Sequence, residues 1–406
     1  ILDGLSWLGL DPDEPPVFQH ARADRHRAVV GELLARGRAY RDYQPASELE
    51  VERERAKAEG RIYRSPWRDQ NAPGDPDRPH VVRFRSPLEG ETVIRDQVQG
   101  EVRFPNSALD DLVLLRTDGA PTYNLAVVVD DHDMGVTHVI RGDDHLNNAA
   151  RQQLIYQALD WPAPAFAHVP LIHGPDGAKL SKRHGAQAAG EFEALGYLPE
   201  ALRNYLVRLG WSHGDDEIFD DAQAAAWFDI ADVNKAPARL DWDKLNHVNA
   251  HYLRVADEER LVRLTADALA REGEAADPAR LRAALPYVRD RAKTVLDLAR
   301  ETAFARARRP LALDDRSRGL LTPEARGRLT RLHLTLAAEP SWNEPALAAA
   351  LKAFAEAEGV GLGKIGPPLR AALTGGLSAP DLSKVLAALG REESLGRLDD
   401  ALSAVQ

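Results

Sequence analysis

The chain contains no cysteine and no long apolar run. Without cysteine it forms no disulfides and has no thiolate for catalysis or metal binding, which is typical of a cytoplasmic protein. Because no run of about 18 apolar residues occurs, we predict no membrane-spanning helix and no membrane partner. These absences exclude disulfide-stabilised secreted proteins, cysteine enzymes and helical membrane proteins, and we expect a cytoplasmic location.

Basic residues are fewer than acidic residues overall, but they cluster in one part of the sequence. The sequence carries 52 Lys and Arg against 63 Asp and Glu, a net charge of −11. Residues 257–406 nevertheless hold 23 basic against 22 acidic side chains, and residues 280–331 hold 14 against 6. A basic segment of this kind can neutralise phosphates and release counterions, which favours a nucleic-acid partner. An exposed basic helix face without a partner explains the same counts equally well.

Residues 173–184 combine a tight turn with a cluster of cations. Pro175, Asp176 and Gly177 are typical of a sharp chain reversal, and Lys179 and Lys182 follow on the loop after it. Two lysines three residues apart can surround a triphosphate, while a serine and backbone amides add directional hydrogen bonds. The apolar residues 166–172 before the turn predict a buried strand, and strand ends are where open α/β sheets bind nucleotides.

A second informative block covers residues 111–145. Residues 112–116 and 136–140 predict strands, and the second strand ends in the polar sequence Arg-Gly-Asp-Asp-His. Residues 146–159 have the apolar spacing of a helix. The segment 121–133 is ambiguous, because its Ala-Val-Val-Val run favours a strand as much as a helix. The polar cluster should therefore lie at the carboxyl end of a strand, where a crevice opens.

Plainer interpretations of this block exist. Tyr123 could be a half-buried core aromatic, and Arg141 could form a surface ion pair with Asp143 or Asp144. The many Asp and His side chains between residues 130 and 145 could also bind a metal, as in a phosphoesterase, although no spaced ligand motif is present.

Both blocks match one known family. Residues 179–183, Lys-Leu-Ser-Lys-Arg, resemble the Lys-Met-Ser-Lys-Ser signature of class I aminoacyl-tRNA synthetases in the form found in glutamyl-tRNA synthetases. The resemblance includes residues 39–41, residues 111–145 and the tail at 366–375, so it covers essentially the whole chain. It implies an α/β fold with a class I Rossmann-type catalytic domain, an α/β insertion and an all-α C-terminal anticodon-binding region. It also implies a helix at 121–133.

The resemblance assigns substrate contacts to individual residues. It implies that Tyr123 and Val127 line the glutamate pocket and that Arg141 pairs with the side-chain carboxylate of glutamate. An arginine suits this role, because its planar fork donates two parallel hydrogen bonds to a carboxylate and stays charged. The family usually has glutamate at the position of Asp143, and the role of this shorter side chain stays open.

The nucleotide contacts follow from the same motifs. The resemblance implies that Asp144, His145 and Ile172 lie beside the ribose and base of ATP. It gives Lys179, Ser181 and Lys182 catalytic roles at the phosphates, together with Mg²⁺. Some family members carry a Cys-x-Cys zinc knuckle where this chain has residues 41–43, Arg-Asp-Tyr, so we expect no zinc and no metal site within the protein.

Other signals concern tRNA and the start of the chain. The resemblance places Arg289, or Arg291 if the alignment shifts, near the position that reads the third anticodon base. The family's His-x-Gly-His motif is absent, and the chain opens without methionine. We therefore expect that a segment carrying this motif, a further carboxylate-binding arginine and the acid that holds the substrate amine precedes Ile1.

Length, apolar content and the positions of Pro and Gly residues predict several domains. A chain of 406 residues with 44% hydrophobic content suggests two to four domains of ordinary size. The predicted segments, in chain order, are the end of the first catalytic half (1–16), an acceptor-stem-binding insertion (17–110), the second catalytic half (111–189), a stem-contact helical domain (190–256) and the helical anticodon-binding region (257–406).

The resulting hypothesis is a glutamate–tRNA ligase that uses ATP to attach L-glutamate to tRNA(Glu) through a glutamyl-adenylate, most simply as a monomer. One alternative is a relative that glutamylates a modified base, queuosine, of tRNA(Asp), but such proteins lack an anticodon region. The other is a non-catalytic tRNA-binding protein derived from the family. The sequence leaves open whether tRNA(Gln) is charged as well.

Overall fold

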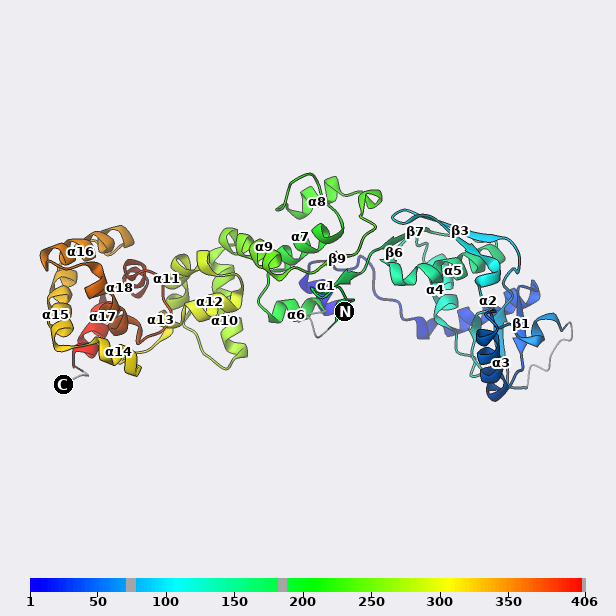
Figure 1. The fold of residues 1–406 in the computed structure, drawn as a ribbon, viewed down its shortest axis with the longest axis horizontal. Coiled ribbons are helices and arrows are strands. Elements are labelled where there is room, and N and C mark those ends of the chain that lie inside the picture. The colour runs from blue at the N-terminus through cyan, green and yellow to red at the C-terminus, as the bar shows by residue number, and fades with distance from the viewer. Residues whose placement is uncertain (71–77, 182–187, 404–406) are drawn as a thin grey trace. The chain divides into compact units, whose positions relative to one another are not determined.

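The computed structural model describes residues 1–70, 78–181 and 188–403. Contacts divide the chain into two compact units (Figure 1). The sheet unit comprises residues 11–184 and 207–240, and the helical unit comprises residues 1–10, 185–206 and 241–406. Residues 190–256, predicted as one helical domain, thus contribute to both units.

The sheet unit begins with a small antiparallel sheet. Strand β2 (Val81–Phe84) lies between β1 (Ala39–Asp42) and β5 (Val113–Leu115). Helix α2 (Ala23–Ala35) packs on these strands through three fully buried residues, Val29, Val30 and Leu33. Helix α3 (Ala46–Ala58) follows β1.

A second sheet of the same unit has the order β4-β3-β7-β6. Strands β3 (Glu91–Asp96), β7 (Ala165–Val169) and β6 (His138–Gly142) are parallel, and β4 (Gly100–Pro105) pairs antiparallel with β3. Helix α5 (Leu146–Ala158) connects β6 to its parallel neighbour β7, as a crossover connection requires. The carboxyl ends of the three parallel strands therefore meet at one edge.

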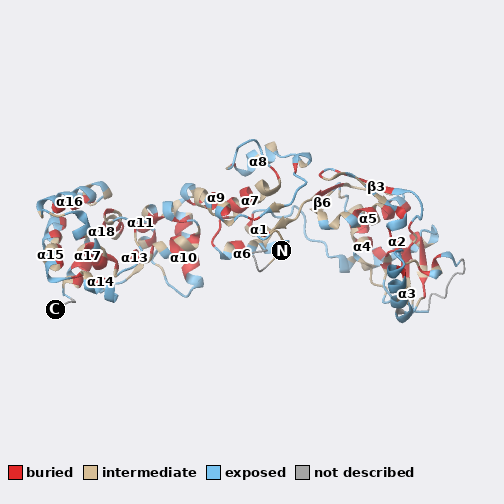
Figure 2. Cartoon of the chain, in the orientation of Figure 1, coloured by how far each residue is buried: buried red, intermediate tan, exposed pale blue. Residues whose placement is uncertain are grey.

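The ambiguous segment 121–133 forms helix α4 (Tyr123–Asp133), as the family resemblance implied. Its β-branched residues alone would favour a strand. Leu125, Val128 and Val129 are fully buried, however, and their three- and four-residue spacing places them on one helix face. They join the core formed with α2 and α5, which Figure 2 colours red. Tertiary packing decides the conformation here.

The two sheets do not divide the chain at residue 110. The hairpin β3–β4 precedes this position but belongs to the sheet of β6 and β7, whereas β5 follows it and belongs to the sheet of β1 and β2. The chain thus crosses between the sheets three times, after β2, after β4 and after β5. The strands near residues 112–116 and 136–140 were placed correctly from local patterns, but strand pairing depends on distant segments, which local patterns do not contain.

Short elements complete the sheet unit. These are η1 (Gln19–Arg22), η2 (Pro66–Asp69), η3 (Asn106–Ala108), η4 (Asp143–His145), β8 (Ile172–His173), α8 (Asp221–Trp227), η6 (Ile230–Asp232) and β9 (Ala238–Arg239). Strand β9 pairs parallel with β8, so the segment 207–240 contacts the chain at the start of the predicted cationic loop.

The helical unit contains no strand among its described residues. Its helices are α1 (Leu2–Trp7), α6 (Ala189–Ala194), α7 (Pro199–Gly210, whose last turn lies in the sheet unit), α9 (Trp242–Val255), α10 (Glu258–Arg271), α11 (Pro278–Val288), η7 (Arg289–Arg291), α12 (Val295–Glu301), α13 (Ala303–Arg306), α14 (Asp315–Leu320), α15 (Pro323–Ala337), α16 (Glu344–Ala357), α17 (Leu362–Thr374) and α18 (Leu382–Ser403, interrupted at Gly390). In the described parts of the chain, none of the helices combines the length and apolar character that crossing a bilayer requires.

A fully buried arginine ties together the C-terminal helices. The Arg397 guanidinium on α18 donates hydrogen bonds to the carbonyl oxygens of Phe304 and Leu373, each at 2.7 Å, and of Ala307 at 2.7 Å. Its Nε donates to Glu393 Oε1 at 2.8 Å. One side chain thus satisfies carbonyl groups in and after α13 and in α17 that would otherwise be buried without a donor.

We expect Arg397→Met to lower the free energy of unfolding by about 3 kcal/mol or more, because it leaves these carbonyls and Glu393 without their donor. Urea denaturation followed by circular dichroism measures the change. Arg300→Met is the matched control, since Arg300 is 68% exposed and, among the residues that the structure describes, forms an ion pair with Asp297 alone, one turn earlier. Its loss should cost less than about 1 kcal/mol. Equal effects of the two substitutions would contradict a structural role specific to Arg397.

Candidate active site

Arg141 lies next to the carboxyl end of β6, facing α5. In the parallel ladder it is in register with His168 on β7, so both side chains project from the same face of the sheet. Its guanidinium carbon lies 5.8 Å from the centre of the Phe166 ring. The fold thus places the predicted carboxylate-binding arginine at the edge where the parallel strands end.

The hydrogen-bond partners of Arg141 are all neutral acceptors. Its Nε donates to His168 Nε2 at 3.1 Å, and its Nη2 donates to Gln152 Oε1 at 2.8 Å and to the carbonyl of His145 at 3.5 Å. Within the described ranges, no Asp or Glu oxygen lies within ion-pair distance of this half-buried guanidinium. The surface ion pair with Asp143 or Asp144 that the sequence allowed is therefore wrong.

Asp131, a half-buried residue on α4, interacts with the charge of Arg141 over a longer distance. Burial raises the pKa of Asp131, and the Arg141 cation opposes this rise. Burial of a charged guanidinium without a bonded counter-ion is costly, so residues around it must supply hydrogen bonds, as they do here. Such an arrangement is suited to receive an anionic group from a ligand.

Tyr123 and Val127 lie one turn apart on α4. The Tyr123 side chain is no core residue, since it is 48% exposed, and its ring centre lies 5.9 Å from that of His145. Val127 is half-buried on the same face of the helix. The described residues therefore bring Tyr123, His145 and Arg141 together.

The turn predicted at residues 175–177 is confirmed. The amide of Gly177 donates to the carbonyl of Gly174 at 2.9 Å, and the amide of Gly174 donates to the carbonyl of Ala178 at 2.8 Å. Gly177 has φ +78°, a left-handed conformation that favours glycine at this point of a hairpin. Lys179 forms a bridge with His173, and the amide of Leu180 donates to the carbonyl of Ile172 at 3.0 Å. The turn thus fixes the backbone from which the lysine projects.

Lys179 reaches back to the polar cluster after β6. Its Nζ lies 2.9 Å from Asp144 Oδ2, and this hydrogen bond holds the pKa of the Asp144 carboxyl below its ordinary value. Both side chains are accessible, with 62% of Lys179 and 39% of Asp144 exposed. The structure therefore joins two residues that sequence analysis placed on separate motifs.

The remaining predicted nucleotide contacts are less fully described. Ile172 is half-buried in β8, next to this hairpin, and Ser181 is half-buried at its end. Lys182 lies outside the described residues, so its catalytic and ATP-binding roles stay predictions. The roles of Ser181 and Ile172 stay predictions as well.

Two buried residues behind Arg141 were missed by sequence analysis. His168 and Asp96 have no exposed side-chain surface, and His168 Nδ1 lies 2.6 Å from Asp96 Oδ2. A signal existed for each: His168 interrupts an apolar strand, and Asp96 ends another. Because 72 residues separate them in the sequence, no local pattern indicated that they form a pair.

Several of the residues considered for a metal site have other partners. Asp130 accepts hydrogen bonds from Arg22 and His26, Asp133 pairs with Arg25, and the His132 ring stacks on Trp161 at 3.8 Å. Among the described residues, no group of three His, Cys, Asp or Glu side chains could hold a metal ion. A metal-dependent phosphoesterase has no support here.

The residues at the place of the family's zinc knuckle are engaged in packing. Asp42 is buried and accepts hydrogen bonds from Arg83 Nε at 2.5 Å and from Ser65 Oγ at 2.8 Å. The Tyr43 ring contacts Trp67 edge-on, with centroids 5.0 Å apart. An ion pair and an aromatic contact connect this part of the chain.

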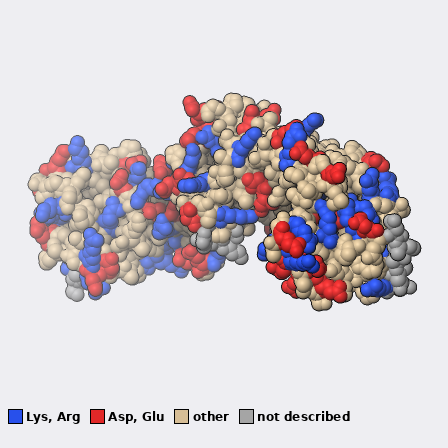
Figure 3. Space-filling view, turned by 45° about the vertical axis from the view of Figure 1, so that its right-hand side comes forward, with Lys and Arg blue, Asp and Glu red and all other residues tan. Residues whose placement is uncertain are grey.

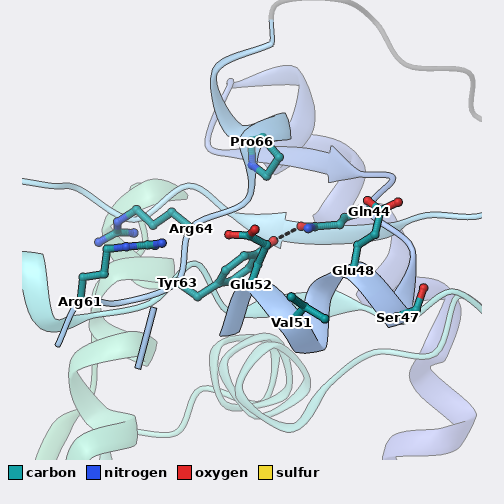
Figure 4. A pocket seen from close by; sticks show the side chains of 9 residues that line it. All are labelled: Gln44, Ser47, Glu48, Val51, Glu52, Arg61, Tyr63, Arg64 and Pro66. Atoms are coloured by element: carbon teal, nitrogen blue, oxygen red, sulfur yellow. Dashed lines mark hydrogen bonds between the residues drawn. The ribbon is translucent and has the colours of Figure 1, made fainter. Parts of the chain in front are cut away.

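A cavity of about 800 Å³ lies away from these residues, beside α3. Figure 4 shows its lining, which comes from residues 44–52 and 61–66 and mixes acidic, basic and apolar side chains. None of the predicted site residues lines it, and we assign it no role.

The predicted anticodon residues lie in the helical unit, on η7. Arg291 forms an ion pair with Glu301 at 3.3 Å, whereas Arg289 has no ion pair among the described residues. Both belong to the basic segment 280–331, whose charge is largely offset by acids from elsewhere. Examples are the ion pairs of Arg282 with Glu259 and of Arg331 with Glu358. Figure 3 accordingly shows basic and acidic side chains interspersed on the visible face.

The sequence agrees with two family descriptions. Residues 1–247 match the catalytic domain of class I tRNA synthetases (E and Q), and residues 259–402 match an anticodon binding domain. A glutamate–tRNA ligase of Phenylobacterium zucineum is 67% identical over 99% of this chain and 87% of its own length. The chain belongs to the glutamate–tRNA ligase family.

Further members of this family are similarly close. A glutamate–tRNA ligase of Caulobacter vibrioides is 64% identical over 99% of this chain and 86% of its own length. The crystal structure of a glutamate tRNA ligase from Elizabethkingia meningosepticum in complex with its amino acid has a TM-score of 0.84 and 29% identity, covering 100% of this chain and 89% of that one. The predicted fold class is confirmed: a class I catalytic region with mixed sheets precedes a helical anticodon-binding region.

For this aminoacyl-tRNA synthetase we expect Lys179→Ala to raise the pKa of Asp144 toward its ordinary value, since the stabilising cation is removed. In the unchanged protein the pair should be intact at neutral pH and should be lost as the pH falls through the lowered pKa of Asp144. NMR of the carboxyl carbon measures the titration. Lys235→Ala is the control, because Lys235 contacts the carbonyl of Gln99 instead. An unchanged Asp144 titration in Lys179→Ala would show that the pair does not form.

Proposed function

We propose that the protein attaches L-glutamate to tRNA(Glu) in two steps, of which the first consumes ATP. The observation that carries this proposal is the half-buried Arg141 guanidinium, whose hydrogen-bond partners are neutral. One of them is the carbonyl of His145, whose ring centre lies 5.9 Å from that of Tyr123. Membership in the glutamate–tRNA ligase family supplies the substrate class.

Arg141 recognises the side-chain carboxylate of glutamate. Two N–H groups of a guanidinium match the two oxygens of a carboxylate, and the opposite charges strengthen both hydrogen bonds. Glutamine presents a neutral amide, one end of which is itself a donor, so it loses most of this attraction. Tyr123 and Val127 form the wall of the pocket on α4.

The chemical step needs no nucleophile from the protein. The α-carboxylate of glutamate attacks the α-phosphorus of ATP, the bond to the bridging oxygen breaks, and pyrophosphate leaves. Lys179 and Lys182 stabilise the charge that develops on the leaving pyrophosphate. A terminal ribose hydroxyl of the tRNA then attacks the glutamyl carbonyl, and AMP leaves.

The pairing of Lys179 with Asp144 fits this scheme. Asp144 and His145 are proposed to contact the ribose and base of ATP, so the carboxylate that holds Lys179 is at the edge of the nucleotide site. Because the pair is solvent-accessible, Lys179 can exchange this carboxylate for the phosphates at little cost.

The described residues do not form a protein site for Mg²⁺. Mg²⁺ commonly binds through substrate phosphates with few protein ligands, and we expect it to enter with ATP. No step of the scheme above depends on a protein-bound metal.

Arg289 is the better supported of the two anticodon candidates. Its guanidinium has no ion pair among the described residues, while Glu301 already offsets the charge of Arg291. A free guanidinium can donate to a base edge or a phosphate. A monomeric state and a cytoplasmic location stay predictions.

Charging of purified tRNA(Glu) with labelled glutamate and ATP tests the proposal. The assay is run on the 406-residue chain and on the protein extended upstream of Ile1 by its reading frame. Formation of glutamyl-tRNA in either form supports the ligase. If neither form charges while both bind tRNA, the non-catalytic alternative is the better account.

We expect Arg141→Ala to lower kcat/KM for glutamate by roughly 100-fold or more, because two charge-assisted hydrogen bonds are lost. Arg141→Lys should recover only part of the loss, since a lysine keeps the charge without the fork. The KM for ATP should change little in both variants. Arg95→Ala is the control, as its side chain is 88% exposed on the same sheet. An unaltered glutamate dependence would remove Arg141 from the pocket.

For tRNA recognition we expect Arg289→Ala to raise the KM for tRNA roughly tenfold without altering the KM for glutamate, because one charged contact is worth about 1–3 kcal/mol. Arg291→Ala should have a smaller effect, since its charge is already paired. Steady-state charging at two salt concentrations measures both variants. A larger effect of Arg291→Ala would transfer the role to that residue.

A further inference from the structure

We propose that Asp96 and His168 act as a positioning pair that fixes the proton pattern and orientation of the Arg141 guanidinium. This inference rests on the proposed role of Arg141 in binding glutamate. It concerns two residues that neither contact the substrate in the scheme above nor belong to a signature motif. The three side chains come from the neighbouring parallel strands β3, β7 and β6.

The pair is completely shielded from water. Both side chains have 0% exposed surface, and the Asp96 carboxylate lies 2.6 Å from His168 Nδ1. The other ring nitrogen of His168, Nε2, lies 3.1 Å from Arg141 Nε. Aspartate, imidazole and guanidinium therefore form one chain of hydrogen bonds that ends at the substrate-binding cation.

The hydrogen-bond partners on both sides of the His168 ring, Arg141 and Asp96, require the same tautomer. Arg141 Nε always carries a hydrogen, so His168 Nε2 must accept. Asp96 Oδ1 accepts from the amides of Val98 at 3.0 Å, Gln99 at 2.8 Å and His168 at 3.0 Å. Burial would raise the pKa of Asp96, but these amides and the His168 ring hold it below its ordinary value. The carboxylate is thus ionised, and Nδ1 of a neutral His168 donates to it.

This arrangement determines which edge of Arg141 faces a ligand. Nε is occupied by His168, and Nη2 donates to Gln152, whose Nε2 in turn donates to Asn124 Oδ1 at 3.1 Å. The described residues provide no hydrogen-bond partner for Nη1. We therefore expect the carboxylate of glutamate to approach end-on, binding Nη1 and displacing the long 3.5 Å contact of Nη2 with the carbonyl of His145. A guanidinium that is already held through Nε and Nη2 loses little conformational entropy when a ligand binds, which favours a low KM for glutamate.

The substitution Asp96→Asn tests the pair with minimal change of shape. Three backbone amides require an acceptor at the Oδ1 position, so the new amide nitrogen must take the Oδ2 position and face His168 Nδ1. His168 Nδ1 must then accept, which moves the ring hydrogen to Nε2, opposite the N–H of Arg141. Two donors would face each other, and Arg141 would lose its fixed orientation.

We expect Asp96→Asn to raise the KM for glutamate roughly 10- to 100-fold in the charging assay, the loss typical of a hydrogen bond to a charged group. The kcat and the KM for ATP and for tRNA should change less than about threefold, because the groups at the phosphates are untouched. Glu91→Gln is the matched control, since it makes the same carboxylate-to-amide change at an exposed position of the same strand. It should leave all four constants unaltered.

A second set of variants separates positioning from folding. His168→Phe keeps a buried ring but removes both nitrogens, and it should raise the KM for glutamate as much as Asp96→Asn does. In the His168→Phe background, Asp96→Asn should add little, because the tautomer it reverses is gone. His168→Gln can place an amide oxygen near the position of Nε2 and should recover part of the affinity. Additive effects of the two substitutions would overturn the proposal.

Nitrogen NMR of the uniformly labelled protein provides a readout that is independent of activity. Comparison with His168→Phe assigns the ring, and we expect a neutral ring protonated at Nδ1 in the unchanged protein and at Nε2 in Asp96→Asn. A ring protonated at Nε2 or doubly protonated in the unchanged protein near neutral pH would overturn the inference. Absence of charging by the unchanged protein would refute the proposed function alone, because the tautomer would still be measured.

Discussion

A positive charge that is half-buried without a bonded counter-ion is the constraint on which the sheet unit depends. The Arg141 guanidinium keeps its charge at any physiological pH, so its surroundings must supply polar partners without neutralising it. The imidazole of His168, the amide of Gln152 and a backbone carbonyl do so. An adjacent carboxylate would satisfy the charge permanently and leave nothing for a substrate. The hydrogen-bond pattern therefore preserves affinity for an external anion.

The fold makes this arrangement through parallel strands. Residues in register on β6 and β7 project side by side, which brings Arg141 next to His168 without any loop to order. Helices α4 and α5 cover the same face and contribute Asn124 and Gln152. Arg141 is thus surrounded by rigid elements, whereas Lys179 projects from a hairpin beyond β8. In the proposed scheme, recognition of the amino acid therefore depends on the sheet, and contact with phosphates depends on a shorter, more exposed segment.

Local sequence patterns predicted most elements of this region but not how they pair. The strand at 112–116 was placed within a residue or two, yet its pairing with β2 depends on a segment about 30 positions earlier. The family resemblance selected Arg141, and sequence adjacency suggested Asp143 or Asp144 as an ion-pair partner. The structure instead connects Arg141 to His168 and Asp144 to Lys179. Likewise the excess charge of residues 280–331 is largely offset by Glu259, Glu358 and other acids that are distant in the sequence.

At the proposed nucleotide site, the contact between Lys179 and Asp144 has a consequence for which anions can compete. A lysine that already has a carboxylate partner offers a lone chloride or acetate little gain, because such an ion would only replace one singly charged neighbour by another. A polyphosphate brings several charges and also contacts groups around the lysine, so it can displace the carboxylate. Asp144 thus acts as a built-in competitor, and Lys179 discriminates by the valence of the incoming ion rather than by its shape.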